Sequence, residues 1–233
     1  ASQLDPRILE HIKNRTIRCI TILKDTHPQI KYDVFERLNT GSVKLNAHEL
    51  RNGLNQGPLM QVVNSISASK DFKTLTSTTR DSRMKAAELV LRFFAFKESR
   101  ENYEKPLSSF LDQFATSNRT ASIEKIDFWK SEFLSAKNLC LKYFGLDAFK
   151  MYNTEQRKFG GFNSAIFDAQ MLGISECQNA AVLAGNADPE AIKAAFIKLF
   201  DDAQFISSVQ RATSDETSVS RRIEKTIAAF NGI

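Results

Sequence analysis

The stretch that decides the fold is residues 122–145, which read SIEKIDFWKSEFLSAKNLCLKYFG. Its apolar residues recur at steps of three and four, the spacing of one face of an α-helix, and they are Ile126, Trp129, Phe133, Ala136, Cys140 and Tyr143. Gly145 follows the last of them and suits the position just past a helix end. The pattern predicts a long helix from about Ser122 whose apolar face packs into a core.

Similar spacing on both sides of this stretch predicts a mainly α fold, a helical array of about nine or ten helices. The other expected helices are 5–14, 30–38, 47–54, 59–66, 84–94, 107–114, 163–172, 189–200 and 215–230. Several have start signals, such as Asp5-Pro6, Asp188-Pro189 and an Asn46–Glu49 capping box. The Ser- and Thr-rich stretch 67–82 is expected to be a loop.

One strand is expected, at residues 17–23, where β-branched side chains are concentrated. A single strand cannot satisfy its own backbone donors and acceptors. It must therefore pair with a weakly signalled segment, with another chain, or with a segment missing from this sequence.

Composition narrows the class of protein. The 233 residues are 42% hydrophobic and 25% charged, with a mean hydropathy of −0.31, which excludes a disordered, collagen-like or membrane-spanning chain. The 32 Lys and Arg against 27 Asp and Glu give a net charge of +5, which is compatible with a polyanionic partner without proving one. Three cysteines without a close pair argue against a disulfide framework and favour a reducing cytoplasm.

The densest polar segment is residues 35–52, which joins two expected helices. A helix N-terminus beside a glycine loop, with positive charge from Arg37, Lys44 and Arg51, suits a phosphate group. The alternative is that these residues only cap a helix and turn the chain. The sequence contains no phosphate-binding glycine loop, dinucleotide-binding turn, His-Glu-x-x-His pair or nucleophile elbow.

A resemblance bears on this segment. The runs Val34–Gly41, Leu45-Asn46 and Glu49–Asn52 resemble the signature of the N-terminal domain of the GmrSD-type restriction family. Four further segments resemble later parts of that domain: Arg83-Met84 with Glu88–Phe96, Phe162–Ala169, Ala212–Ser214 and Ser220–Ile223.

The resemblance implies a ParB-like α/β half carrying an Asp-Gly-Gln-Gln-Arg motif for nucleotide hydrolysis, followed by a helical half. It also implies a role in bacterial defence against phage DNA, often DNA with modified bases, together with an HNH nuclease domain or partner. This sequence contains neither that motif nor a His-rich nuclease segment, and Ala86 stands where the family tends to have an acidic residue.

We therefore expect the chain to be the C-terminal portion of a longer, cytoplasmic, nucleotide-dependent restriction protein. Residues 1–56 would end the α/β domain, and residues 57–233 would form a helical domain with a subdivision near 150–161. The chain alone is expected to hydrolyse no nucleotide, whereas the full-length protein would use an NTP with Mg. The partners implied are modified phage DNA, a nuclease domain or subunit, and a second copy that pairs with the open strand.

The resemblance points to six residues as contacts to nucleotide or DNA phosphate: Arg37, Asn39, Thr40, Gly41, Arg51 and Asn52. No catalytic residue and no metal ligand is assigned. The alternative function is a non-catalytic helical module that binds DNA or a nuclease partner and needs no nucleotide.

Three further features receive structural interpretations. The aromatic residues between Phe93 and Phe133 have helical spacing and are expected in the core. Arg221-Arg222 with Lys225 is interpreted as a solvated helix face, with phosphate contact as the alternative. Asp201-Asp202 is interpreted as a helix end.

Overall fold

The computed structural model describes residues 5–16, 45–80 and 83–233, together with Cys19, Thr21, Leu23, Thr26, Ile30 and Val34. The chain divides into two compact units, Ala1–Val43 and Lys44–Ile233. The first unit contains α1 (Pro6–Lys13), which Asp5 caps by accepting a hydrogen bond from the Arg7 backbone N–H at 2.8 Å. The strand expected at 17–23 and the helix expected at 30–38 fall outside the described residues, apart from isolated positions.

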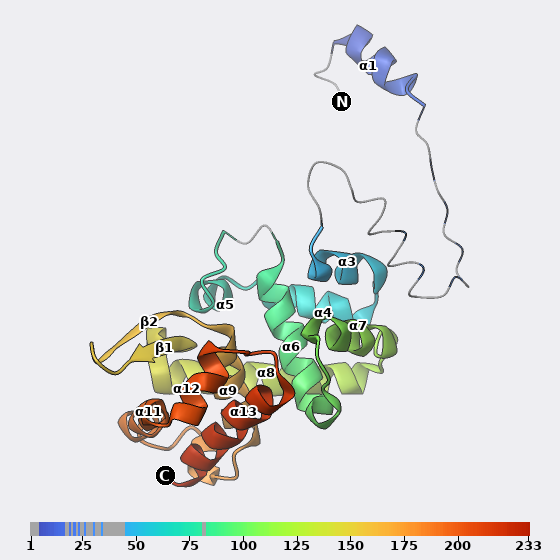
Figure 1. Cartoon of the computed structure of the whole chain (residues 1–233). Helices are drawn as coiled ribbons and strands as arrows, with labels where there is room; N and C mark the ends of the chain where they lie inside the picture. The colour runs from blue at the N-terminus through green and yellow to red at the C-terminus, as the bar shows by residue number, and fades with distance from the viewer. Residues whose placement is uncertain are drawn as a thin grey trace. The chain divides into compact units, whose positions relative to one another are not determined.

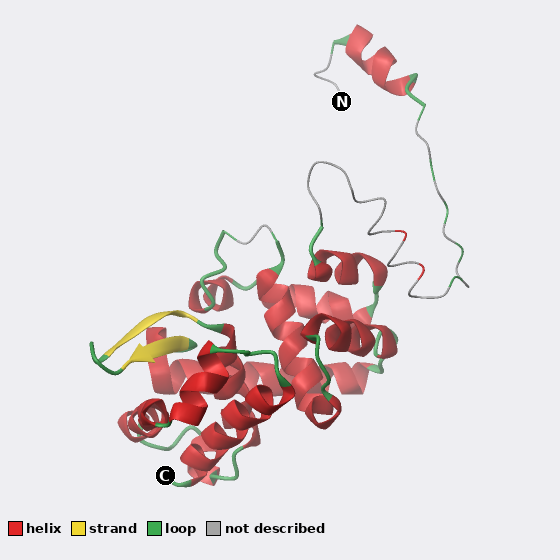
Figure 2. Ribbon diagram, in the orientation of Figure 1, coloured by secondary structure: helices red, strands yellow, loops and turns green. Residues whose placement is uncertain are grey.

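The second unit is a helical array, which confirms the mainly α expectation (Figures 1 and 2). Its helices are α3 (Ala47–Leu54), α4 (Pro58–Ser67), α5 (Lys70–Leu75), α6 (Lys85–Ser99), α7 (Leu107–Ser117), α8 (Ile123–Phe144), α9 (Ser164–Glu176), α10 (Ala180–Leu183), α11 (Pro189–Lys198), α12 (Ala203–Gln210) and α13 (Glu216–Asn231). Single 3-10 turns, η1 (Arg100–Asn102), η2 (Gly145–Asp147) and η3 (Leu199–Asp201), follow α6, α8 and α11. α3 packs against α6 and α7 and so belongs to this unit, whereas the sequence division after residue 56 placed it with the preceding domain.

Three of these helices were not predicted: α5, α10 and α12. Each is short, and its stability comes from packing rather than from its own propensity. α5 lies inside the stretch interpreted as a loop, and it forms because Phe72 and Leu75 are buried in the core. α10 is held by the Tyr143 hydroxyl, which donates to the Val182 carbonyl at 2.7 Å.

The core is built around α8 and α9. α8 begins and ends as predicted: Ser122 accepts a hydrogen bond from the Lys125 backbone N–H at 3.3 Å, and Gly145 has a φ of +57°. α9 packs against both α8 and α13, and every residue from Ala165 to Ile174 is buried.

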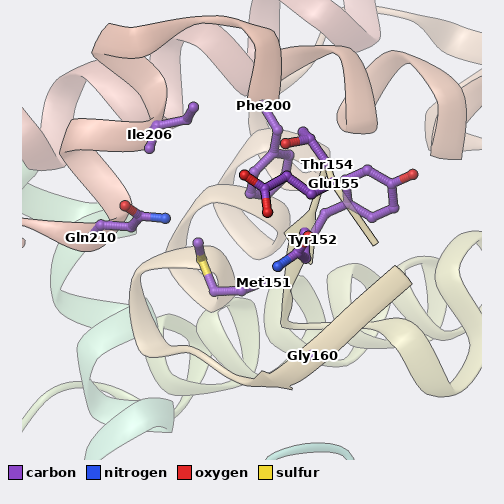
Figure 3. A pocket seen from close by; sticks show the side chains of 9 residues that line it. Met151, Tyr152, Thr154, Glu155, Gly160, Phe200, Ile206 and Gln210 are labelled. Carbon is purple, nitrogen blue, oxygen red and sulfur yellow. The ribbon is translucent and has the colours of Figure 1, made fainter. Parts of the chain in front are cut away.

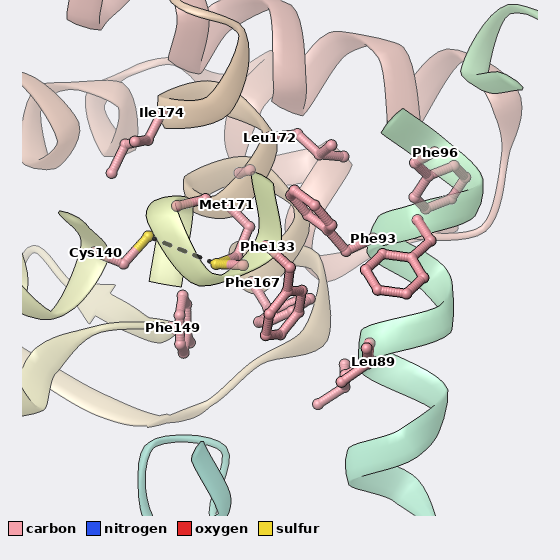
Figure 4. Close-up of a cluster of buried hydrophobic side chains, with 14 of the residues drawn as sticks. Leu89, Phe93, Phe96, Phe133, Cys140, Phe149, Phe167, Met171, Leu172 and Ile174 are labelled. Carbon is pink, nitrogen blue, oxygen red and sulfur yellow. Dashed lines mark hydrogen bonds between the residues drawn. The ribbon is translucent and has the colours of Figure 1, made fainter. Parts of the chain in front are cut away.

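Aromatic rings fill the space between the core helices, as expected from their spacing. The ring of Phe133 on α8 meets Phe93 of α6 edge to face at 5.3 Å and Phe72 of α5 at 5.4 Å between centroids. Figure 4 shows Phe93, Phe133 and Phe167 converging from three helices. These rings stabilise the fold and are closed to stacking with nucleic-acid bases.

The backbones of α9 and α13 approach each other closely at one point. A Cβ atom added at Gly173 would lie 2.9 Å from the Thr226 Cβ and closer still to its Cγ2. Glycine is therefore required at this position in α9 because any side chain would push α13 away.

A β-hairpin interrupts the helices between α8 and α9. β1 (Lys150–Asn153) pairs antiparallel with β2 (Lys158–Phe162), with Tyr152 opposite Phe159. The sequence indicated only a boundary near 150–161, because the strands are short and Gly160-Gly161 weakens the strand signal. Among the described helices, none combines the length and the apolar character needed to cross a membrane.

Candidate functional site

Of the segments that resemble the restriction-family signature, Leu45-Asn46 and Glu49–Asn52 are described, and Glu49–Asn52 lies on α3. Two polar residues fix the start of that helix. The Asn46 side chain accepts from the Glu49 backbone N–H at 2.9 Å, and the Glu49 carboxylate accepts from the Asn46 backbone N–H at 2.6 Å. This is the predicted capping box. Asn46 also donates to the Arg83 carbonyl at 2.7 Å, and Glu49 lies 3.3 Å from the Arg83 guanidinium. The N-terminus of α3 is thereby joined to the segment that precedes α6.

Arg51 joins the same helix to α7. Its side chain has no exposed surface. Its Nε donates to Asp112 at 2.7 Å, and its Nη2 donates to the Ser108 carbonyl at 3.2 Å. Its Nη1 lies 3.1 Å from His48 Nδ1, and because a guanidinium can only donate, that ring nitrogen is the acceptor. We infer that His48 is neutral, with its proton on Nε2.

Asn52 joins α3 to α4. Its Oδ1 accepts a hydrogen bond from Asn64 Nδ2 at 2.8 Å. One turn further on, Asn55 accepts from the Thr116 hydroxyl of α7 at 3.2 Å, and Arg119 Nε donates to the Gln56 carbonyl at 3.2 Å. We call these contacts of residues 46–56 with α4, α6 and α7 the α3 anchor.

The six residues predicted to contact phosphate thus fall into two groups. Arg37, Asn39, Thr40 and Gly41 lie outside the described residues. Arg51 and Asn52 are described, and both are engaged within the chain. The buried Arg51 presents no donor to an external phosphate in this conformation, and phosphate contact by the six residues stays a prediction.

A second polar centre lies in the core and joins α6, α9 and α13. Asp168 Oδ2 accepts hydrogen bonds from Arg92 and from Arg222 Nη2, the latter at 2.6 Å. Arg222 Nη1 also donates to the carbonyls of Ser208 at 3.2 Å and Thr213 at 2.7 Å. We call Arg92, Asp168 and Arg222 the buried triad. It corrects the interpretation of Arg222 as part of a solvated face, because that side chain is fully buried.

The buried triad carries two positive charges against one negative charge. Burial lowers the pKa of Arg222, and the Asp168 carboxylate opposes this effect. Asp168 Oδ1 and the Nε atoms of both arginines have no hydrogen-bond partner among the described residues. The group is almost fully buried, and its three side chains come from α6, α9 and α13, so its ion pairs tie these helices together.

Sequence reasoning missed the triad, although a signal was present. Arg92 and Asp168 each lie inside an apolar run, and Arg222 follows Val219 at core spacing. A charged residue at a core position requires a buried partner of opposite charge. The three residues also come from three separate family-like segments, which the fold brings into direct contact.

The remaining charged residues near Arg222 are at the surface. Lys225 pairs with Asp202 at 2.6 Å, and Asp202 caps α12 by accepting from the Gln204 backbone N–H at 2.8 Å. This confirms the interpretation of Asp201-Asp202 as a helix end. Within the part of the chain that is described, no three His, Cys, Asp or Glu side chains group as ligands for a metal ion.

Comparison with known proteins finds no relative of this chain. No family model matches the sequence, and no curated protein or solved structure is significantly similar to it.

Proposed function

We propose that the chain is part of a GmrSD-type, nucleotide-dependent restriction protein that acts on DNA, and that residues 45–233 are its non-catalytic support. Motif resemblance supports the family, and the α3 anchor supports the role. In this proposal the full-length protein uses an NTP with Mg and acts on modified phage DNA together with an HNH nuclease domain or subunit.

The α3 anchor carries the argument about the role. Glu49, Arg51 and Asn52, the second half of the signature, bind three different elements of the helical unit. Burying Arg51 is costly unless the charge is paired and hydrogen bonded. A segment that only turns the chain at the surface does not need a buried, hydrogen-bonded charge. A segment whose position must be fixed does. We assign Arg51 and Asn52 as positioning residues that hold α3 against α7 and α4.

The contacts to nucleotide or DNA phosphate are then proposed for Arg37, Asn39, Thr40 and Gly41. Charge favours this division over a broad DNA-binding surface on the helices. Residues 45–233 hold 24 Lys and Arg against 22 Asp and Glu, and many of these form internal ion pairs. Such a nearly neutral unit lacks the excess of cations that phosphate binding by a whole surface requires.

The test compares three arginine variants in the protein as its native cell makes it: Arg37→Ala, Arg51→Ala and, as a control on α1, Arg7→Ala. Arg37→Ala should abolish nucleotide turnover and phage restriction without lowering the melting temperature. Arg51→Ala should lower the melting temperature. At a temperature where Arg51→Ala is still folded, it should raise the KM for nucleotide, and Arg51→Lys should restore part of that loss. Arg7→Ala should change nothing.

Unchanged turnover and plating efficiency in both Arg37→Ala and Arg51→Ala would remove the segment from the site. The alternative, a module that binds DNA or a nuclease without nucleotide, predicts DNA affinity that is independent of NTP and falls steeply between about 50 and 200 mM salt.

A further inference from the structure

A cavity of about 400 Å³ lies beside the β-hairpin. One wall is made by five consecutive residues of β1 and its turn, Met151–Glu155, with Gly160 of β2. The other wall is made by Phe200 of η3 and by Ile206 and Gln210, which lie one turn apart on α12 (Figure 3). None of these residues belongs to a family-like segment, so the cavity is separate from the α3 anchor.

Polar groups in this cavity have unused hydrogen-bonding capacity. Glu155 and Gln210 form no side-chain hydrogen bond or ion pair with another described residue. In Figure 3 the Gln210 amide points from α12 toward the side of the cavity where Glu155 and Met151 lie. Asn153 Oδ1 accepts from the Gln156 backbone N–H at 2.7 Å, which leaves its NH₂ group to donate to a ligand. The cavity therefore offers a charged acceptor, a donor and an amide that can do both.

The apolar part of the lining is a thioether beside two aromatic rings. Met151 supplies the thioether, and the ring of Tyr152 meets the buried ring of Phe200 edge to face at 5.9 Å between centroids. Thioether and aromatic surfaces pack well against planar heterocycles. The volume falls within the range of about 300–1,000 Å³ that is typical of small-ligand pockets.

Three positively charged residues are neighbours of the lining residues in the sequence. Arg157 and Lys158 follow the lining residues of the turn, and Arg211 follows Gln210. All three are exposed, and none forms an ion pair with a described carboxylate.

From this chemistry we propose that the cavity binds a nucleobase that carries an amino group, either in a free nucleotide or as an unpaired base of a DNA strand. The Glu155 carboxylate accepts from the amino group and from a neighbouring ring N–H, and Asn153 and Gln210 bind the remaining edge. Guanine presents those two donors side by side and binds best; thymine, which has no amino group, binds worst. The proposal goes beyond the proposed function because it concerns a different site and needs no nucleotide hydrolysis.

Calorimetric titration of the 233-residue chain with GMP, AMP, CMP and TMP tests the specificity. GMP should bind at least tenfold more tightly than TMP, a difference of about 1.4 kcal/mol. Glu155→Gln should weaken GMP binding about tenfold, whereas Glu190→Gln, which changes an exposed carboxylate on α11, should not affect it. A parallel titration with a single-stranded oligo-dT containing one dG identifies the source of the base: tighter binding than GMP indicates a DNA strand, and weaker binding a free nucleotide.

Two glycines of β2 provide a steric test. A Cβ at Gly160, in the lining, meets only the Met151 carbonyl at 3.6 Å, and a Cβ at Gly161, outside it, meets nothing within 4 Å. Neither Cβ meets a close neighbour, so Gly160→Val, which places a branched side chain in the lining, should weaken GMP binding, and Gly161→Val should leave binding and melting temperature intact. Equal binding of GMP and TMP, full binding by Gly160→Val, or no binding of any probe at millimolar concentration would overturn the proposal.

Discussion

Replacing Asp168 by asparagine should destabilise the helical unit more than any surface substitution. The change removes the only negative charge of the buried triad and leaves Arg92 and Arg222 facing each other in the core. Their exposed fractions are 7% and 0%, so solvent cannot screen the repulsion. Breaking a buried ion pair by removing one partner costs about 3–5 kcal/mol.

That cost is a large part of the stability of a domain, which is about 5–15 kcal/mol. For a domain of 150–250 residues, each kcal/mol lowers the melting temperature by about 2–4 °C, so Asp168→Asn should melt about 6–20 °C below the parent. The measurement is thermal and urea unfolding followed by circular dichroism. The matched control is Asp127→Asn, an exposed carboxylate on α8 that forms no described ion pair.

A double-mutant cycle tests the mechanism. Arg222→Gln alone loses the same ion pair, and Asp168→Asn with Arg222→Gln removes both charges. If the triad acts as one unit, the double variant loses less stability than the sum of the two single losses, by about 0.5–3 kcal/mol. A melting temperature for Asp168→Asn within about 2 °C of the parent, or strictly additive losses, would refute the reasoning.

Further predictions concern other contacts. Gly173→Ala should destabilise the protein by about 1–3 kcal/mol because its methyl group meets Thr226, whereas Gly53→Ala on the open side of α3 should stabilise it; urea unfolding compares the two. The hydrogen bond from Lys137 holds the pKa of Asp71 below its ordinary value of 3.8, so this carboxylate stabilises the fold above that pH, and the contribution is lost as the pH falls through the depressed pKa. The melting temperatures of Asp71→Asn and the parent should accordingly differ at pH 7 and converge in acid. Burial raises the pKa of the Cys140 thiol, so a thiol reagent should label the exposed Cys19 quickly and reach Cys140 and Cys177 only when the chain unfolds.

The parts of the fold that local signals specify could be predicted from the sequence. Ser122 and Gly145 mark the two ends of α8 by cap chemistry, and Asn46 with Glu49 marks the start of α3. The parts that depend on distant contacts could not. α5 forms because Phe72 meets Phe133, 61 positions further along the chain, and β1 and β2 are too short for their alternation to stand out.

The candidate site divides in the same way. The sequence predicted that Arg51 lies on a helix. It did not predict that the side chain is buried, because its partners Asp112 and Ser108 belong to another helix. Arg222 was interpreted as solvated from its neighbour Arg221, although its spacing from Val219 already placed it on the core face of α13. The cavity beside the hairpin had no sequence signal, because its walls come from segments about fifty residues apart.

The place of α13 also has a consequence for how the protein is made. α9 is buried partly by α13, and Asp168 receives one of its two charged partners from that helix. A chain emerging from the ribosome can form α3 through α9 well before residues 216–231 exist, but it then holds an open face on α9, where Asp168 is paired with Arg92 alone. The helical unit therefore completes its folding only after α13 has been translated, and a premature stop before residue 216 would release a chain for the cell's chaperones and proteases.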